Sequence, residues 1–258
     1  MLRQIILVDK NAKLIEFWRR GLADLKYVKI CTEDLDKLDF SAMESPKTKA
    51  SAAVVSPGNS FGWLGGGFDL ALQRFFGGPE FETYFRQQLG PTGYKPVGTA
   101  TVVELGTKWS KNGITRVIHV PTVVAPSLSR KVYDPARPVE TGYGLVFNTL
   151  WSALTNTPKD AEVLVVPGLA TGFAGVPVEV CSKAMELAIR LFQGSGSGSV
   201  SMSLELRNVI IMQFLGYRYN NFVPPQCLEE CARLGINTKA LLAYDACKDP
   251  IASILPQF

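Results

Sequence analysis

A glycine-rich segment in the first third of the chain has the composition of a phosphate-binding loop. Residues 53–71 run from an apolar strand through Asn59 to three consecutive glycines, Gly65, Gly66 and Gly67, which immediately precede a helix. Glycines at this place let the backbone approach a ligand closely, and the exposed amides at a helix start favour an anion. The spacing matches neither the dinucleotide-binding fingerprint nor the phosphate loop of nucleotide hydrolases. A phosphate site of another kind is therefore predicted, with a plain flexible loop as the alternative.

A second segment, residues 165–177, repeats the order of strand, glycine loop and helix. Gly168 and Gly172 lie in its loop, and Pro177 suits the first turn of the helix, where the missing N–H leaves nothing unpaired. Two such loops at the carboxyl ends of strands in one open sheet can hold a single elongated ligand across the crevice between them. A diphosphate has the shape and charge for this arrangement.

Two polar residues beside the first loop could act on such a ligand. The side-chain amide of Asn59 both donates and accepts hydrogen bonds, which suits ribose hydroxyls and adds no charge near a phosphate. Alternatively, Asn59 caps the turn. Asp69 falls in the first turn of the helix, where a carboxylate complements the helix dipole. Because a carboxylate repels a phosphorylated ligand, its other possible role is to accept a hydrogen bond from a ribose hydroxyl or to position an attacking water.

His119, the one histidine of the chain, lies on the apolar strand expected at residues 116–120. Strand alternation places its side chain on one face with Val117, while Ile118 and Val120 take the other face. A lone histidine on a strand is either a core residue with satisfied hydrogen bonds or a general acid and base, since its ordinary pKa of about 6.5 suits proton transfer.

These residues need a scaffold, and the chain alternates short β-branched runs with amphipathic stretches. The alternation predicts an α/β fold with a central sheet covered by helices on both faces. Strands are expected at residues 5–8, 28–31, 52–56, 100–105, 116–120, 162–166 and 208–214. Helices are expected at residues 12–21, from about residue 69, and at residues 143–154 and 177–192.

The chain is predicted to form one domain over residues 1–258. The run of glycines and serines at 193–203 cannot bury enough apolar surface to order itself, so we expect a flexible loop between the last large helix and the last core strand. The segment 41–50 is interpreted as another exposed loop. A helical C-terminal addition is expected over residues 223–258, introduced by two consecutive prolines.

Composition limits the classes of function. Of the 258 residues, 47% are hydrophobic and 19% are charged, which is enough apolar material for one large core. The formal net charge of +4 is spread without runs of like charge, so nucleic-acid binding is not predicted. No stretch approaches the ~18 apolar residues that a membrane-spanning helix needs. The five cysteines are scattered along the sequence, which suits free thiols in a reducing compartment. A cytosolic or nuclear protein is expected.

Two of the cysteines, Cys227 and Cys231, lie four residues apart on an expected helix, so both thiols could face one metal ion. A zinc site needs about four ligands, and the other cysteines and His119 are distant in sequence. The alternative is two small buried side chains on one helix face. Neither a metal nor another cofactor is predicted.

The order of these motifs resembles that of the macro domain family. The resemblance rests on VSPGNS at 55–60, LGGGFD at 64–69, IHVPT at 118–122 and TGFAGVP at 171–177, and it extends over nearly the whole chain. Within the family, the first three stretches are similar to the branch of ADP-ribose 1″-phosphate phosphatases. The resemblance implies a three-layer α/β/α sandwich with a mixed sheet and a small-molecule ligand, ADP-ribose or a derivative of it.

By this resemblance, the chain removes phosphate from ADP-ribose 1″-phosphate, as in the processing of a tRNA-splicing by-product. The implied catalytic residues are Asn59, which orients the distal ribose, Asp69, which positions water, and His119, which acts as acid and base. The implied substrate-binding residues are Asp34, Leu35, Gly58, Gly65, Gly66, Gly67, Phe68, Gly168, Thr171, Gly172, Phe173 and Ala174.

Two departures from the family pattern concern ligand contacts. Many macro domains have Asn-Ala-Ala where residues 56–58 stand, so of two family asparagines only Asn59 is carried over. Ala174 stands where an aromatic ring is frequent, with Phe173 beside it. Asp34 matches the family aspartate that holds adenine. The alternative is that Asp34 is a surface acid or a helix cap.

Two other functions stay open: an ADP-ribose-binding module without turnover, and a hydrolase that removes ADP-ribose from protein side chains.

Overall fold

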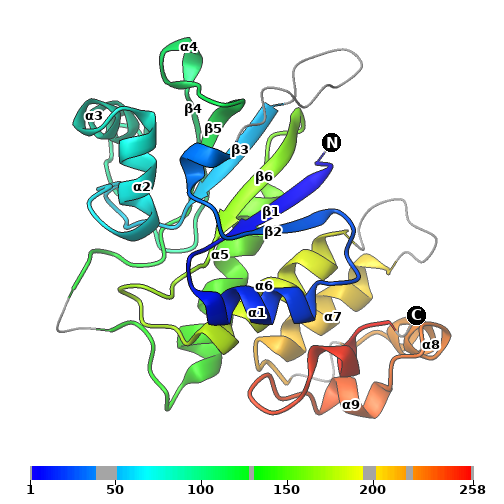
Figure 1. Ribbon diagram of the computed structural model, residues 1–258. Coiled ribbons are helices and arrows are strands. Elements are labelled where there is room, and N and C mark those ends of the chain that lie inside the picture. Colours follow the sequence, from blue (N-terminus) through cyan, green and yellow to red (C-terminus); the bar gives the residue numbers. More distant parts are fainter. Residues whose placement is uncertain (1, 39–50, 128–130, 194–201, 219–222, 257–258) are drawn as a thin grey trace.

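The computed structural model describes residues 2–38, 51–127, 131–193, 202–218 and 223–256. Its centre is a six-stranded sheet in the order β2-β1-β6-β3-β5-β4 (Figure 1). Strand β4 is antiparallel to β5, and the other neighbouring pairs are parallel. The strands are β1 (Gln4–Val8), β2 (Val28–Cys31), β3 (Ser51–Ser56), β4 (Thr101–Glu104), β5 (Ile114–His119) and β6 (Ala161–Pro167).

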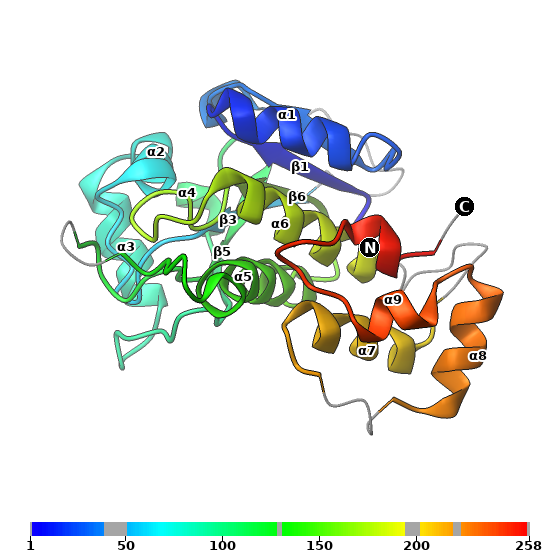
Figure 2. The ribbon, with the colours of Figure 1, turned by 90° about the horizontal axis from the view of Figure 1, so that it is seen from below.

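Helices cover both faces of this sheet (Figures 1 and 2). Helices α2 and α3 lie on one face, and α1, α5 and α6 lie on the other, with α7 packed beyond them. The mixed sheet between two helical layers confirms the predicted α/β/α class. The longer helices are α1 (Ala12–Gly21), α2 (Gly67–Phe76), α3 (Pro79–Gln88), α5 (Gly144–Thr155), α6 (Val178–Gln193) and α7 (Leu204–Phe214). Shorter elements are η1 (Leu35–Lys37), α4 (Gly106–Trp109) and η2 (Val139–Tyr143).

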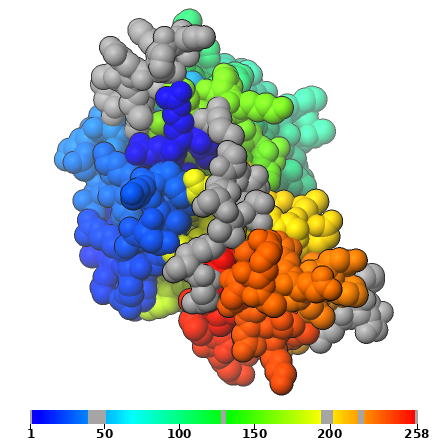
Figure 3. Space-filling model, turned by 90° about the vertical axis from the view of Figure 1, so that its right-hand side faces the viewer, coloured from blue at the N-terminus to red at the C-terminus, as the bar shows by residue number. Residues whose placement is uncertain are grey.

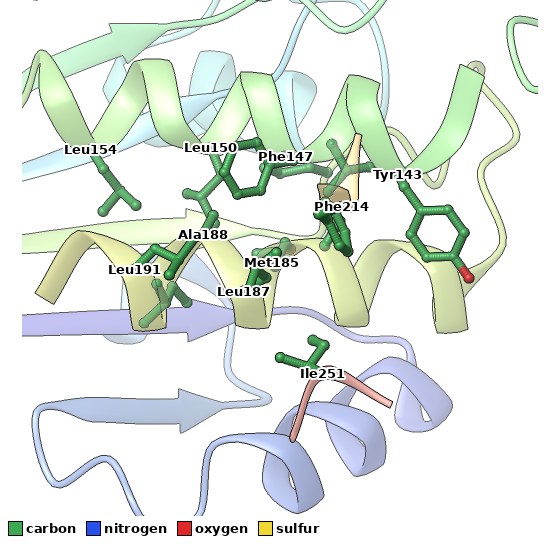
Figure 4. Packing of buried hydrophobic residues seen from close by; sticks show 14 of the residues in the cluster. Tyr143, Phe147, Leu150, Leu154, Met185, Leu187, Ala188, Leu191, Phe214 and Ile251 are labelled. Atoms are coloured by element: carbon green, nitrogen blue, oxygen red, sulfur yellow. The ribbon is translucent and has the colours of Figure 1, made fainter. Parts of the chain in front are cut away.

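Alternating strand side chains divide the apolar core into two layers. On β5, Val117 joins the layer beneath α2 and α3, while Ile118 joins the layer beneath α5 and α6, as strand alternation predicted. Figure 4 shows Phe147 of α5 above α6, with Phe214 of α7 close by. The centroids of these two rings are 5.7 Å apart. Each such fully buried side chain contributes about 1.5 to 3 kcal/mol through removal of apolar surface from water.

The position of β6 brings the two glycine-rich segments together. Strands β3 and β6 are parallel neighbours in the middle of the sheet, with Ala53 opposite Leu164 and Val54 opposite Val165. Because parallel strands end at the same edge of a sheet, the loops that follow β3 and β6 leave side by side.

Residues 208–214, which we predicted to be the last core strand, lie in helix α7 instead. The helix begins after Ser203, whose hydroxyl accepts a hydrogen bond from the amide of Leu206 at 3.1 Å. The β-branched residues of 208–214 suggested a strand, but the buried side chains are spaced as on one face of a helix. The buried side chains are Leu206, Val209, Ile210, Gln213 and Phe214. The segment 193–203 therefore joins two helices. Its residues 194–201, like all of 41–50, lie outside the described part of the chain.

The C-terminal residues pack against α7 at one corner of the molecule (Figure 3). They form α8 (Pro225–Arg233), α9 (Thr238–Leu242) and the turn η4 (Ile251–Ile254). Cys227 and Cys231 are buried on α8 among apolar side chains. Among the described residues, no three His, Cys, Asp or Glu side chains gather as a metal site. Within the same residues, no helix has the length and apolar character needed to span a membrane.

Candidate functional site

The two glycine loops border one open cavity of about 670 Å³, a size suited to a small-molecule ligand. Most residues implied by the sequence resemblance line it. They are Gly58, Asn59, Gly65, Gly66, Gly67, Phe68, Asp69, Gly168, Thr171, Gly172, Phe173 and Ala174. Three implied residues, His119, Asp34 and Leu35, lie outside the lining.

Asn59 organises the first loop. Its Oδ1 accepts hydrogen bonds from the amides of Phe61 at 3.1 Å and Trp63 at 3.3 Å, and its Nδ2 donates to the Trp63 carbonyl at 2.8 Å. The side chain therefore does cap the turn. It also lines the cavity, so contact with a ribose hydroxyl stays a prediction for the remaining Nδ2 hydrogen.

The second loop is a tight turn held by backbone hydrogen bonds. The amide of Gly175 donates to the Gly172 carbonyl at 2.9 Å, and the amide of Val176 donates to the Ala170 carbonyl at 3.0 Å. Ala170 has a left-handed backbone with φ of 60°. A residue with a side chain adopts this conformation only where its surroundings enforce it. The loop is therefore shaped before a ligand arrives.

Asp9 is a cavity residue that sequence reasoning missed. It directly follows β1, and its Oδ2 accepts a hydrogen bond from the Gly168 amide at 3.1 Å. A Cβ atom on Gly168 would lie 2.5 Å from this oxygen, so the contact requires glycine there. The available signal was an acidic residue at the carboxyl end of a strand. Its meaning depends on β1 lying beside β6, which the sequence does not reveal.

Asp34 and Leu35 do not line the cavity. Asp34 forms an exposed ion pair with Lys10 just before η1, and this ion pair lowers the pKa of its carboxyl. The side chain of Leu35 is buried in the core layer beneath α2. A contact between Asp34 and adenine stays a prediction of the resemblance.

We expect Asp9→Ala to weaken ADP-ribose binding more than Asp34→Ala does. The first change removes the acceptor that holds the Gly168 amide, whereas the second removes an exposed ion pair of little energetic weight. Calorimetric titration of both variants with ADP-ribose and with ribose 5-phosphate measures the effect. A loss in Asp34→Ala confined to the adenosine-containing ligand would instead assign the adenine end to Asp34.

Asp69, Ser56 and His119 form a hydrogen-bonded group beside the first loop. The Ser56 hydroxyl donates to Oδ1 of Asp69 at 2.9 Å, and its oxygen lies 3.2 Å from Nδ1 of His119. The other ring nitrogen of His119, Nε2, lies 3.1 Å from the Asn59 carbonyl oxygen. Of the three side chains, only that of Asp69 lines the cavity. The hydroxyl of Ser56 thus connects a cavity residue with a core residue.

The surroundings of His119 are those of a core residue. Its side chain is fully buried, and the Phe85 ring stands edge-on to it with centroids 5.3 Å apart. Both ring nitrogens have partners. The implied direct action of His119 on a ligand therefore meets a physical obstacle, because the imidazole has no surface in the cavity.

Burial shifts both titratable groups. It raises the pKa of Asp69 to about 7, with Glu82 adding to the rise and the hydrogen bond from Ser56 opposing it. Burial also lowers the pKa of His119 to about 4. Near neutral pH, Asp69 can therefore both hold and release a proton, as a general acid or base must. Its neutral form does not repel a phosphate.

Gly58 allows this group to pack closely. A Cβ atom on Gly58 would lie 2.3 Å from Oδ2 of Asp69 and 3.1 Å from Cε1 of His119. Any side chain at this position would displace the carboxyl group from its place at the cavity. The close approach of the backbone explains why glycine stands beside Asn59.

The remaining cavity surface combines one cation with exposed aromatic rings. Lys131 is the single basic residue among the described residues of the lining. Trp63 and Phe173 line the cavity from the first and second loops and are 41% and 45% exposed. A cation beside amide-rich loops suits an anionic ligand, and the rings offer flat surfaces to a sugar or base. Sequence reasoning missed Lys131, because a lone lysine outside the motifs carries no signal.

Comparison with known proteins gives matches at the level of family. The family model described as Macro-like domain matches residues 5–258. A protein of Aquifex aeolicus (strain VF5), described as uncharacterized, is 31% identical over 161 residues, which are 60% of this chain and 84% of the relative.

Two solved macrodomain structures are similar to the chain. The macrodomain of Mycobacterium tuberculosis DarG has 21% sequence identity and a TM-score of 0.42, over 62% of this chain and 88% of that chain. An Oceanobacillus iheyensis macrodomain with ADP has 18% identity and a TM-score of 0.45, over 66% of this chain and 86% of that chain. The family model spans nearly the whole sequence, and on this ground the chain belongs to the macro-like domain family.

Proposed function

We propose that the chain binds ADP-ribose in this cavity and removes the phosphate of ADP-ribose 1″-phosphate. Binding is supported by family membership and by the two glycine loops that border one cavity. The observation that carries the catalytic part is Asp69, a buried acid that lines the cavity and has a pKa near neutrality. A site for binding alone has no need of an acid tuned to neutral pH.

In the proposed reaction, Asp69 moves the protons. Its neutral carboxyl donates a proton to the ribose oxygen as the bond from that oxygen to phosphorus breaks. A water molecule attacks the phosphorus and returns a proton to the carboxylate, so Asp69 ends as it began and the products are ADP-ribose and inorganic phosphate. Phosphoryl transfer of this kind depends mainly on positioning and charge stabilisation. Lys131 supplies a positive charge, and Asn59 supplies a donor for the distal ribose.

Incubation of the purified chain with ADP-ribose 1″-phosphate should release inorganic phosphate, measured colorimetrically, with Asp69→Asn as the control. Calorimetry with ADP-ribose tests the binding part separately. Phosphate release equal in the chain and the control would contradict the catalytic proposal. No release together with intact ADP-ribose binding would support a binding module, which the burial of His119 favours as the second candidate.

A further inference from the structure

The hydrogen bonds around Ser56 form a chain with a limited number of protons. This row of hydrogen bonds runs from the Asn59 carbonyl to Nε2 of His119, from Nδ1 of His119 to the Ser56 hydroxyl, and from that hydroxyl to Oδ1 of Asp69. A carbonyl oxygen can only accept, so Nε2 must carry a proton. The hydroxyl of Ser56 has one proton, which it can donate to only one of its two neighbours.

Two proton arrangements satisfy all three contacts. In the first, Ser56 donates to an ionised Asp69 and accepts from the Nδ1–H of an imidazolium. In the second, a protonated Asp69 donates to Ser56, whose hydroxyl donates to Nδ1 of a neutral imidazole. Besides the fixed proton on Nε2, each arrangement places one further proton on the pair of Asp69 and His119. With no further proton on the pair, one neighbour of Ser56 lacks a donor, and an unpaired buried acceptor is unfavourable.

We propose that Ser56 is a positioning residue that joins Asp69 and His119 into one unit holding a single proton, through which the buried imidazole acts on the cavity. The catalytic part of this inference rests on the proposed function, since it needs Asp69 to take part in phosphate release. His119 is fully buried and outside the cavity lining, so its influence must pass through its hydrogen-bond partners. Ser56 is the partner that also contacts Asp69.

The surroundings of the pair favour the single shared proton near neutral pH. Burial raises the pKa of Asp69 to about 7 and lowers that of His119 to about 4, so one proton stays on the pair between these limits. Two charged groups act on the pair from neighbouring segments: Glu82 of α3 raises the pKa of Asp69, and Lys95 lowers the pKa of His119. Phe85 contacts the imidazole without adding charge.

A matched pair of variants, Ser56→Thr and Ser56→Val, isolates the hydroxyl, because threonine and valine have nearly the same shape. The direct readout is the titration of the Asp69 carboxyl by carbon-13 NMR, with the signal assigned by its loss in Asp69→Asn. Threonine should keep the midpoint of the wild-type chain. Valine should shift it by about half a pH unit or more, because the protonated carboxyl and the carboxylate both lose their hydrogen-bond partner. In addition, His119→Gln should shift the Asp69 midpoint when Ser56 is present. The same substitution should leave the Asp69 midpoint unchanged when it is combined with Ser56→Val.

Turnover gives a second readout. Ser56→Val and His119→Gln should each lower phosphate release by ~10-fold or more, and the double variant should be no slower than the slower single variant. The alkaline limb of the pH profile should move with the Asp69 midpoint in Ser56→Val. A merely structural role would lower the melting temperature and leave this limb in place. Ser182→Ala, which changes a buried serine of α6 away from the cavity, should match the wild-type chain.

Three results would overturn the inference: an unchanged Asp69 midpoint in Ser56→Val, a shift by His119→Gln of equal size with and without the hydroxyl, or losses of turnover that multiply in the double variant. If Ser56→Val does not fold, as judged by its melting curve, Ser56→Ala takes its place. A wild-type chain that releases no phosphate would contradict the proposed function alone, and the NMR titration would still decide whether the pair shares a proton.

Discussion

Replacing Asp69 by asparagine should lower phosphate release from ADP-ribose 1″-phosphate by ~10² to 10⁴, the usual contribution of a general acid or base. The affinity for ADP-ribose should stay within about tenfold of the wild-type value, because a group that acts on a breaking bond stabilises the transition state more than the bound ligand. Asparagine keeps the size of the side chain and a hydrogen-bond acceptor for Ser56. Single-turnover phosphate release and calorimetry on the same preparation measure the two effects.

Comparison with Asn59→Ala tests whether the two side chains have different roles. Alanine at position 59 removes the ligand donor and also three contacts that shape the first loop, so affinity, turnover and melting temperature should all fall. Equal losses of affinity in Asp69→Asn and Asn59→Ala would place Asp69 in binding rather than in catalysis.

The Asp69→Asn variant should also respond differently to pH. A carboxyl whose pKa is raised in the folded chain contributes stability that is present in full below its ordinary pKa and is lost once the pH has risen through about 7. Asparagine does not titrate and loses nothing over this window. As the pH rises from about 4 to about 7, the melting temperature of Asp69→Asn should therefore rise relative to that of the wild-type chain. Above about pH 7, the difference between the two melting temperatures should stay constant. A constant difference across the whole window would mean that Asp69 is ionised throughout.

Replacing Gly66 by glutamate should abolish detectable ADP-ribose binding while leaving the circular dichroism spectrum intact. A Cβ atom on Gly66 would lie 3.2 Å from Cε2 of Phe173, the exposed ring of the second loop, so a longer side chain must occupy the space between the loops. Glutamate also adds negative charge where a diphosphate is expected. Calorimetry with millimolar ADP-ribose checks the outcome.

Gly66→Gln separates bulk from charge, since glutamine has the size of glutamate and no charge. We expect weak residual binding in Gly66→Gln and none in Gly66→Glu. If both variants bind as the wild-type chain does, the three glycines provide flexibility and the ligand lies elsewhere.

The sequence predicted those parts of the fold that depend on local patterns. Short, mostly apolar runs such as 52–56 and 162–166 predicted β3 and β6. Alternation predicted that His119 and Ile118 face opposite layers. The prediction was wrong for 208–214, because β-branched residues suggested a strand where the spacing of buried positions is helical. Helix α3 was missed altogether.

Within the site, the sequence indicated which residues gather but not how deep each one lies. Motifs identified the two loops and Asp69, which line one cavity. Strand order was not available from the sequence, so the contact of Asp9 with Gly168, between strands far apart in the chain, could not be inferred. Alternation gives the face on which His119 lies, whereas its complete burial depends on Phe85 from α3.

The place of β6 in the sheet also constrains how the chain can fold during synthesis. Strands β1 and β2 pair with each other early, and β3, β4 and β5 form a second group, but only β6 pairs with both β1 and β3. Until residues 161–167 leave the ribosome, the two groups expose open strand edges, which are liable to pair with other chains. These long-range pairings also predict slow folding. A nascent chain that stops before β6 should therefore depend on chaperones and should bind no nucleotide, because half of its cavity does not yet exist.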